Sequence, residues 1–375
     1  MNLVLTYYHD LHKIPEISGQ EYETAQYIFY SLEEMGYTPQ HIGETGIFAD
    51  LVTDPAGPWI LLRADTDALA IQESSCAAVI SENPGVMHAC GHDGHSAMLL
   101  TAARELYGKR LPQNVRFLFQ PAEETTKGAA EMIECGVIPR NLRACFAMHL
   151  WPGVPKGVAV TTSSKMMASS DVFRIQIQGR QAHCAQQKLG ADALRTAVEI
   201  GARLPAIQEE AEEVQTILFC GSIHSGSSHN VVPDSASMMG TIRSFSARDR
   251  EHMKTQLETL CQKTASCYGT KVLVEWDGGC PALRNDPVLI GALRDLDPAV
   301  QVGLTPTMAA EDFACYQEYA PGVMLWVGIG DTPPLHNGAF YIPEDILSEG
   351  VALWQKIAQH DWDKEGTPWA AEIQN

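Results

Sequence analysis

The sequence contains no segment that could cross a membrane and no sign of a secretory leader. A membrane-spanning helix needs about 18 or more consecutive apolar residues, and no such run occurs in the 375 residues. The first ten residues, MNLVLTYYHD, lack the basic start and the long apolar stretch of a signal peptide. Internal repeats and low-complexity tracts are also absent. We therefore expect a cytoplasmic globular protein.

Positive charge is scarce. The chain carries 26 Lys and Arg against 46 Asp and Glu, which gives a formal net charge of -20. A surface of this sign repels phosphate backbones and anionic lipid heads, so nucleic acid and membrane surfaces are not expected as partners. The charge otherwise bears on solubility rather than on function.

Cysteine is present, but not in the pattern of a disulfide framework. The ten Cys are scattered along a large chain, without the density or spacing of small secreted domains. We expect most of them to be reduced and buried, with the exception of Cys90, whose neighbours indicate a different role.

Two domains are expected, because 375 residues exceed the size of a typical single domain. In the first part of the chain and again after Pro281, short apolar runs alternate with helical patterns, which predicts an α/β sheet covered by helices on both faces. Strands are expected at 46–52, 59–62, 115–119, 145–150 and 322–329, and helices at 22–35, 96–106, 126–135, 287–295 and 344–360.

The middle of the chain follows a different order. The patterns predict a strand at 172–178, a helix at about 191–212, strands at 216–223 and 237–245, a helix at about 247–267 and a strand at 271–276. This βαββαβ order is that of a ferredoxin-like unit of about 110 residues. We therefore expect a discontinuous catalytic domain, residues 1–170 plus 285–375, interrupted by an inserted lid domain at 171–284.

The segment HACGHDGH, residues 88–95, packs three His, one Cys and one Asp into eight positions. Zinc and similar metals favour thiolate together with imidazole, and Cys90 and His92 stand close enough for one loop to direct both at a metal site. Gly91 and Gly94 allow the tight backbone that this requires. A Gly-rich turn with incidental histidines is the alternative, which the density of the cluster disfavours.

Three more polar clusters follow predicted strands. Glu123 and Glu124 end the segment QPAEE, His149 closes the strand CFAMHL, and RADTD, residues 63–67, follows the strand WILL. In open α/β sheets, ligands gather at the carboxyl ends of strands, so these clusters are expected to share one crevice. A pair of carboxylates allows one to bind a metal while the other takes a proton from water. A solvated surface pair is the ordinary alternative for two adjacent Glu.

Seven segments, in order, then resemble the motifs of the M20 metallopeptidase family. They are RADTDALAIQE (63–73), GVMHACGHDGHSAMLL (85–100), FQPAEE (119–124), MHLWP (148–152), NVVPDSASMMGTIRSF (230–245), AAEDFA (309–314) and PLHNGAF (334–340). The most similar branch consists of amidohydrolases that act on hippurate, N-acyl amino acids and indole-acetyl amino-acid conjugates. The resemblance runs from about residue 8 to residue 358. It implies a mixed-sheet, metallopeptidase-like catalytic domain with the inserted lid.

This resemblance implies five ligands for two divalent metal ions: Cys90, His92, Glu124, His149 and His336. Cys90 takes the place of the bridging Asp of other M20 enzymes, and His336 rests on the resemblance, because pattern alone would not select a lone loop histidine. A mixed Cys, His and Glu set could accept Mn²⁺, Zn²⁺, Co²⁺ or Ni²⁺. Glu123 is implied as general base and then acid, and Asp65 as a residue that orients a ligand.

The same resemblance assigns substrate contacts to the inserted domain. His183, in GRQAH, is expected to reach across a homodimer formed through the lid and to stabilise the tetrahedral oxyanion. Asn230 and Arg243 are expected to hold the carboxylate of the substrate. The chain departs from the family after His183, where CAQQK lacks the usual Pro. A preference for hippurate-like substrates is therefore not implied.

The expected reaction is metal-dependent hydrolysis of a small N-acyl amino acid to a carboxylic acid and a free amino acid. Two other functions compete with it. A dipeptidase or aminoacyl peptidase of the same superfamily would act on a substrate whose amine is free rather than acylated. A non-catalytic metal or ligand binder should have lost a ligand or the base, whereas Glu123 and all five expected ligands are present.

Overall fold

A computed structural model describes residues 2–363, and these divide into two compact units. Unit 2 comprises Met167–Leu283 and Thr307–Glu311, and unit 1 contains the rest. Residues 307–311, which the sequence analysis places with the catalytic domain, join unit 2 because the Ala168 N–H donates to the carbonyls of Thr307 (3.2 Å) and Ala309 (2.9 Å). No helix among the described residues combines the length and apolar character needed to span a bilayer.

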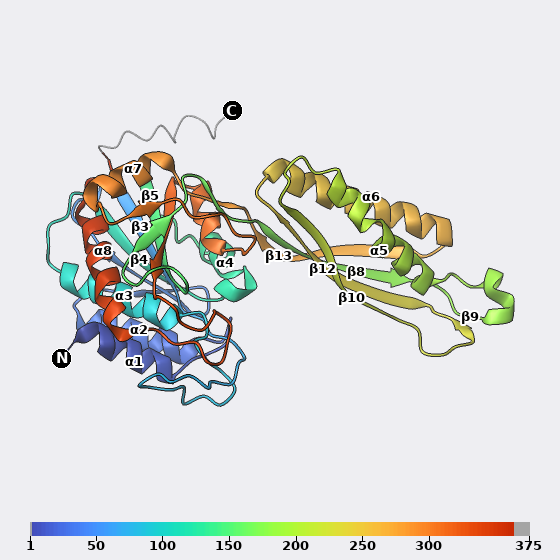
Figure 1. The fold of residues 1–375 in the computed structure, drawn as a ribbon, viewed down its shortest axis with the longest axis horizontal. Helices are drawn as coiled ribbons and strands as arrows, with labels where there is room; N and C mark the ends of the chain where they lie inside the picture. The colour runs from blue at the N-terminus through green and yellow to red at the C-terminus, as the bar shows by residue number, and fades with distance from the viewer. Residues whose placement is uncertain (1, 364–375) are drawn as a thin grey trace. The chain divides into compact units, whose positions relative to one another are not determined.

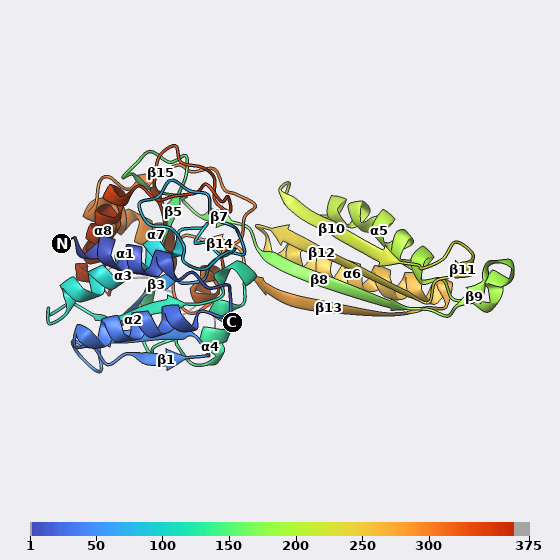
Figure 2. The same cartoon turned by 90° about the horizontal axis from the view of Figure 1, so that it is seen from below.

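Unit 1 is built on a mixed sheet of eight strands (Figures 1 and 2). Its four central neighbours, β4, β3, β5 and β16, run parallel, whereas β1, β2 and β6 each pair antiparallel with a neighbour. In spatial order the strands are β1 (Gln40–Ile42), β2 (Gly46–Leu51), β4 (Asn114–Gln120), β3 (Trp59–Asp65), β5 (Leu142–Trp151), β16 (Gly322–Gly328), β6 (Ala159–Thr161) and β15 (Gln301–Val302).

Helices cover both faces of this sheet. Successive side chains of β3 point to opposite faces, and both sets are buried. Ile60, Leu62 and Ala64 point into the main apolar core together with residues of α3, while Arg63 points to the opposite face and binds Asp312 of η3. The layer over the main core contains α1 (Leu3–Lys13), α2 (Tyr22–Glu34), α3 (His92–Leu106), α7 (Pro287–Leu296) and α8 (Leu347–Gln359). The shorter elements of unit 1 are η1 (Glu123–Thr125), α4 (Gly128–Glu134), η3 (Asp312–Glu318) and η4 (Glu344–Ile346).

The helix α3 begins at His92, four residues before the start predicted from the apolar pattern. Gly91 occupies the position before the first helical residue with φ 87°, a left-handed conformation that glycine adopts without steric cost. The polar stretch from His92 to His95 is therefore the first turn of a buried helix rather than an open loop.

Unit 2 contains the predicted βαββαβ order in an antiparallel sheet, β10-β12-β8-β13. Both long helices pack on the same face of this sheet (Figures 1 and 2), over a core that includes Phe173, Ile175 and Leu257. The elements are β8 (Ser170–Gln178), α5 (Ala193–Glu209), β10 (Thr216–Ser225), β12 (Ser235–Ser244), α6 (Ala247–Tyr268) and β13 (Lys271–Cys280). The short elements are β9 (Ala182–His183), η2 (Cys184–Leu189) and β11 (Val231–Val232). β7 (Lys165–Met167) and β14 (Leu283–Arg284) each include residues of both units, because the chain passes from one unit to the other within them.

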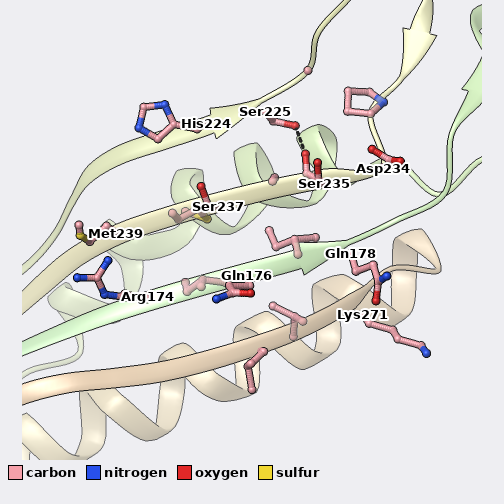
Figure 3. A pocket seen from close by; sticks show the side chains of 18 of the residues that line it. Arg174, Gln176, Gln178, His224, Ser225, Asp234, Ser235, Ser237, Met239 and Lys271 are labelled. Atoms are coloured by element: carbon pink, nitrogen blue, oxygen red, sulfur yellow. Dashed lines mark hydrogen bonds between the residues drawn. The ribbon is translucent and has the colours of Figure 1, made fainter.

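The other face of the unit 2 sheet is exposed and forms an open groove of about 1180 Å³ (Figure 3). Its lining combines polar side chains with the exposed Leu273. Arg174 and Gln176 of β8 and Ser237 of β12 contribute to its lining. Because side chains alternate along a strand, these residues lie between the buried residues that pack against α5 and α6. The groove is therefore the solvated side of a sheet that is covered on one face.

We predict that Gly128→Ala destabilises unit 1. A Cβ at Gly128 would collide with the backbone carbonyl of Pro121, in the segment that leads into η1, and overpacking of this kind costs about 1–3 kcal/mol. Thermal unfolding should therefore begin at a lower temperature than in the wild type. Gly291→Ala is the matched control, because a Cβ at this position in α7 meets nothing within 4 Å and alanine favours a helix. Equal midpoints for both variants would contradict the prediction.

Candidate metal centre

The side chains of the centre come from the carboxyl ends of three neighbouring strands and from the start of α3. β3 leads to Asp65 and Asp67, β4 leads to η1 with Glu123 and Glu124, and His149 lies near the end of β5. Because these strands are parallel neighbours, their carboxyl ends meet at one edge of the sheet, where open α/β folds bind ligands.

The structure brings all five predicted ligands together in unit 1. Ligand atoms of Cys90, His92 and His149 lie within 4.8 Å of one another, and so do those of Cys90, Glu124 and His336. Cys90 Sγ lies 3.5 Å from His149 Nε2, and His336 Nε2 lies 3.1 Å from Glu124 Oε1. Cys90 belongs to both groups, so the arrangement offers two adjacent sites that share one thiolate.

Two of the histidines are held in the tautomer that a metal ligand needs. His92 donates its Nδ1–H to Asp67 Oδ1 (3.1 Å), and His149 donates its Nδ1–H to the carbonyl of Leu150 (2.8 Å). Each ring then presents Nε2 to the centre. Nε2 of His92 is buried, lies 3.8 Å from Asp65 Oδ2 and makes no hydrogen bond of good geometry among the described residues. Since a buried polar atom is seldom left unpaired, this atom fits a bound cation.

Burial sets the charges of two ligands. It raises the pKa of the Cys90 thiol well above its ordinary value, so a nearby cation is needed to stabilise the thiolate. It also lowers the pKa of His149 well below its ordinary value, which keeps this imidazole neutral and able to bind a metal through Nε2. The donor set of thiolate, imidazole and carboxylate therefore fits divalent transition metals.

Asp65, predicted to orient a ligand, lies beneath the centre and is fixed from two sides. It accepts hydrogen bonds from His95 Nδ1 (2.6 Å) and from Arg63 Nη1 (2.8 Å). His95 can only donate through Nδ1, because its Nε2 accepts the N–H of Leu150 (2.8 Å). Burial works against the ionised form, but the neighbouring His92, His95 and Arg63 side chains hold the pKa of Asp65 well below its ordinary value.

Asp67 is a supporting residue that the sequence analysis missed. This carboxylate is 1% exposed and accepts from His92 Nδ1, from the N–H of Glu124 (3.0 Å) and from the hydroxyl of Ser18 (2.7 Å). It thus positions the side chain of one ligand and the backbone of another. The repeat of Asp at two-residue spacing in RADTD is the signal that could have revealed it, because both residues follow the same strand.

Glu123 lies beside the ligands and is 7% exposed. An oxygen of its carboxylate lies within 4.8 Å of ligand atoms of His92 and Glu124. The preceding residue, Ala122, has φ 57°, a left-handed conformation that is uncommon for a residue other than glycine. This turn begins η1, the element on which both glutamates lie.

His183, predicted to stabilise the oxyanion, and Asn230 and Arg243, predicted to hold the substrate, lie in unit 2, and the structure does not bring all three together within that unit. His183 is exposed on β9 and pairs with Val231 of β11, next to Asn230. Arg243 is partly buried near the far end of β12, where burial lowers the pKa of its guanidinium. His183 and Asn230 are therefore neighbours, and Arg243 is separated from them by most of a ten-residue strand.

Comparison with known proteins agrees with this geometry. The model of peptidase family M20/M25/M40 matches residues 61–360. The chain is 36% identical to an N-acetyl-L-cysteine deacetylase of Bacillus subtilis over 90% of its own length and 83% of the relative. It is 31% identical to the IAA-amino acid hydrolase ILR1-like 4 of Arabidopsis thaliana, with 93% and 83% covered.

Among solved structures, the chain is similar to the Bacillus subtilis YXEP protein, described as a dinuclear metal binding peptidase of the M20 family. The TM-score is 0.79 at 32% identity, and the alignment covers 95% of this chain and 96% of the other. With the family model and these relatives, the chain belongs to peptidase family M20/M25/M40, in its branch of metal-dependent amidohydrolases.

Proposed function

We propose that the protein hydrolyses the amide bond of N-acyl amino acids and releases a carboxylic acid and a free amino acid. The observation that carries the proposal is the pair of ligand groups sharing Cys90, with the carboxylate of Glu123 beside them. Relatives named as an N-acetyl-L-cysteine deacetylase and an IAA-amino acid hydrolase support a substrate with an acylated amine.

In this proposal the five ligands hold two divalent cations. Cys90, His92 and His149 would bind one, and Cys90, Glu124 and His336 would bind the other. When bound, such cations supply Lewis acidity that polarises a carbonyl and lowers the pKa of water towards neutrality. Mn²⁺, Zn²⁺, Co²⁺ and Ni²⁺ are all compatible with the ligand set.

Glu123 is the proton carrier of the proposed reaction. It takes the proton from the attacking water and then gives it to the nitrogen of the leaving amino acid. Its neighbour Glu124 has the separate duty of a ligand, and Asp67 fixes the backbone N–H of Glu124 at 3.0 Å. Glu124 shares a ligand group with Cys90 and His336, whereas Glu123 lies beside that group, so the two adjacent carboxylates can serve different functions.

His183 is suited to stabilise the oxyanion, which forms on the carbonyl oxygen of the acyl group when water attacks. Its Nδ1 accepts the backbone N–H of Ala185 (3.2 Å), so the neutral ring carries its proton on Nε2 and can donate it. A preorganised donor aimed at developing negative charge lowers the barrier of acyl transfer. Asn230 and Arg243 would hold the carboxylate of the substrate, for which the planar guanidinium is suited.

The distance between these residues supports a homodimer formed through unit 2. Arg243 is the ninth residue of β12, which begins at Ser235, and at about 3.3 Å per residue this places it about 26 Å along the strand. His183 lies near the start of that strand. One copy cannot present both side chains to one small substrate, whereas two copies can each contribute one of them.

Glu123→Gln should bind metal like the wild type and lose most of its turnover. The amide cannot accept a proton, and general acid-base catalysis contributes about a hundred- to ten-thousandfold in rate. Metal content is measured on the purified protein, and kcat on N-acetyl amino acids. Glu134→Gln, an exposed change in α4, is the matched control and should behave like the wild type. Turnover near the wild-type rate in Glu123→Gln would reject this residue as the base.

A substrate panel separates the proposed activity from its competitors. Wild-type protein loaded with each defined metal should hydrolyse hippurate, N-acetyl amino acids or N-acetyl-diaminopimelate and leave simple dipeptides intact. Cleavage of dipeptides alone would instead favour a peptidase, the activity named for the similar YXEP protein. Folded, metal-loaded protein that cleaves nothing in the panel would favour a binding function.

Mixing two inactive variants tests whether His183 acts on the site of a second copy. His183→Ala and Glu123→Gln should each be inactive alone, but a mixed dimer would contain one complete site. After free exchange of subunits, about a quarter of the wild-type activity should return, because half of the dimers are mixed. If His183 acts within its own chain, the mixture stays inactive.

A further inference from the structure

Residues 12–21, the 12–21 segment, precede the part of the chain that the family model matches and contain none of the proposed ligands. The segment leaves α1 and runs along the end of β3, where Ile17 pairs with Ala68 and the N–H of Ala68 donates to the carbonyl of Glu16 (2.8 Å). We propose that His12, Ser18 and Glu21 of this segment are positioning residues for the metal centre. The inference rests on the roles proposed for Glu123 and the five ligands.

Glu21 holds the turn that precedes the base. Its side chain is fully buried, and Oε1 accepts the N–H of Gly19 (2.8 Å) and the N–H of Ala122 (2.9 Å). Oε2 accepts the hydroxyl of Thr45 (2.9 Å). Ala122 is the left-handed residue directly before Glu123. Because this conformation is unfavourable for alanine, the bond from its N–H to Glu21 helps to keep η1 directed at the centre.

Ser18 holds the carboxylate on which two ligands depend. Its hydroxyl donates to Asp67 Oδ2 (2.7 Å), and the same oxygen accepts the N–H of Glu124 (3.0 Å). The other oxygen of Asp67 accepts His92 Nδ1 (3.1 Å). A carboxylate with three donors has little freedom to rotate, so Ser18 completes the support of Glu124 and His92.

His12 links the segments that carry His92 and His336. Its Nδ1 binds Asp93 Oδ2 (2.6 Å), and Asp93 is the residue after His92. Its Nε2 binds Glu73 Oε1 (3.2 Å), and the next residue, Ser74, donates its N–H to the carbonyl of Gly338 (2.7 Å).

The His12 ring is charged in this position. Burial works against the charge, but the hydrogen bonds to Asp93 and Glu73 raise the pKa of His12 to about 10. Ion pairs that are removed from water in this way are geometrically demanding, which suits a connection between two ligand-bearing segments.

Glu21 contacts Ala122, the residue before the base, and His12 contacts Asp93, the residue after the ligand His92. Ser18 contacts Asp67, which itself holds Glu124 and His92. Outer partners that orient metal ligands typically account for about ten- to a hundredfold in metal affinity or activity. Loss of such a partner loosens the ligands but leaves the substrate contacts in place. The expected signature is weaker metal binding and lower kcat, with KM little changed.

The test compares three variants of the full chain: Glu21→Ala, Glu21→Gln and Glu16→Ala. Glu21→Ala removes the acceptor of the Ala122 N–H. Glu21→Gln keeps an acceptor oxygen there, and the Thr45 hydroxyl can turn to accept from the new amide. Glu16→Ala is the control for stability. The Glu16 side chain accepts the N–H groups of Glu23 (3.1 Å) and Thr24 (2.9 Å) at the start of α2, and the substitution keeps the backbone carbonyl that accepts the N–H of Ala68.

Zn²⁺ affinity is measured on the metal-free proteins by competition with a chromogenic chelator, alongside thermal unfolding and kcat. Glu21→Ala should bind Zn²⁺ about ten- to a hundredfold more weakly, Glu21→Gln should recover most of that loss, and Glu16→Ala should lose stability while its Zn²⁺ affinity stays at the wild-type value. Unchanged Zn²⁺ affinity in folded Glu21→Ala would overturn the inference. So would an equal loss of affinity in Glu16→Ala at an equal loss of stability.

Failure of the proposed function gives a different result. If the wild type cleaves no N-acyl amino acid, the chelator competition still reports whether Glu21 supports the metal centre, because it does not depend on turnover. If the wild type is active and the three variants bind Zn²⁺ alike, the function stands and the positioning role of Glu21 is rejected.

Discussion

Unit 1 buries several carboxylates at the carboxyl end of its sheet, and the surrounding residues must compensate their negative charge. Asp65, Asp67 and Asp312 are each at most 1% exposed, and an ionised carboxylate is stable away from water only when opposite charge or hydrogen bonds compensate it. Arg63 donates to both Asp65 and Asp312 at 2.8 Å, and His92 faces Asp67. Cations held by the proposed ligands would complete this balance. Metal binding and the stability of this edge of the sheet are therefore expected to be coupled.

The ligands reach this edge from distant parts of the chain, and so do their supports. Parallel strands deliver Glu124 and His149 to one side of the sheet, and α3 delivers His92 through its first turn. The supports come from a third region, since Ser18 and Glu21 contact the segments after β3 and β4. No short motif can form this centre alone, because Asp67, which orients His92 and the backbone of Glu124, lies 25 and 57 residues from them in the sequence.

This separation explains what the sequence could and could not predict. The density of HACGHDGH indicated Cys90 and His92, and the apolar strands before Glu124 and His149 indicated the shared edge. His336 required the family resemblance, since it is a loop residue with φ 59° and follows no periodic pattern. The roles of the 12–21 segment remained hidden, because they depend on contacts across 49 residues from Ser18 to Asp67 and 101 residues from Glu21 to Ala122. Periodicity reports which face of an element is buried, not which distant segment meets it.

The two units place different demands on their functional residues. In unit 1, buried partners hold the ligands from several directions, so substitutions there should act on metal binding and on the chemical step. His183 in unit 2 is exposed, and its ring is oriented by the N–H of Ala185 in η2 (3.2 Å). This short helix is formed by the stretch after His183 that departs from the family pattern. If His183 contacts the substrate as proposed, the departure alters the support of a substrate-binding residue while leaving the metal ligands intact. Substrate preference can therefore diverge from that of the relatives without any change in the metal centre.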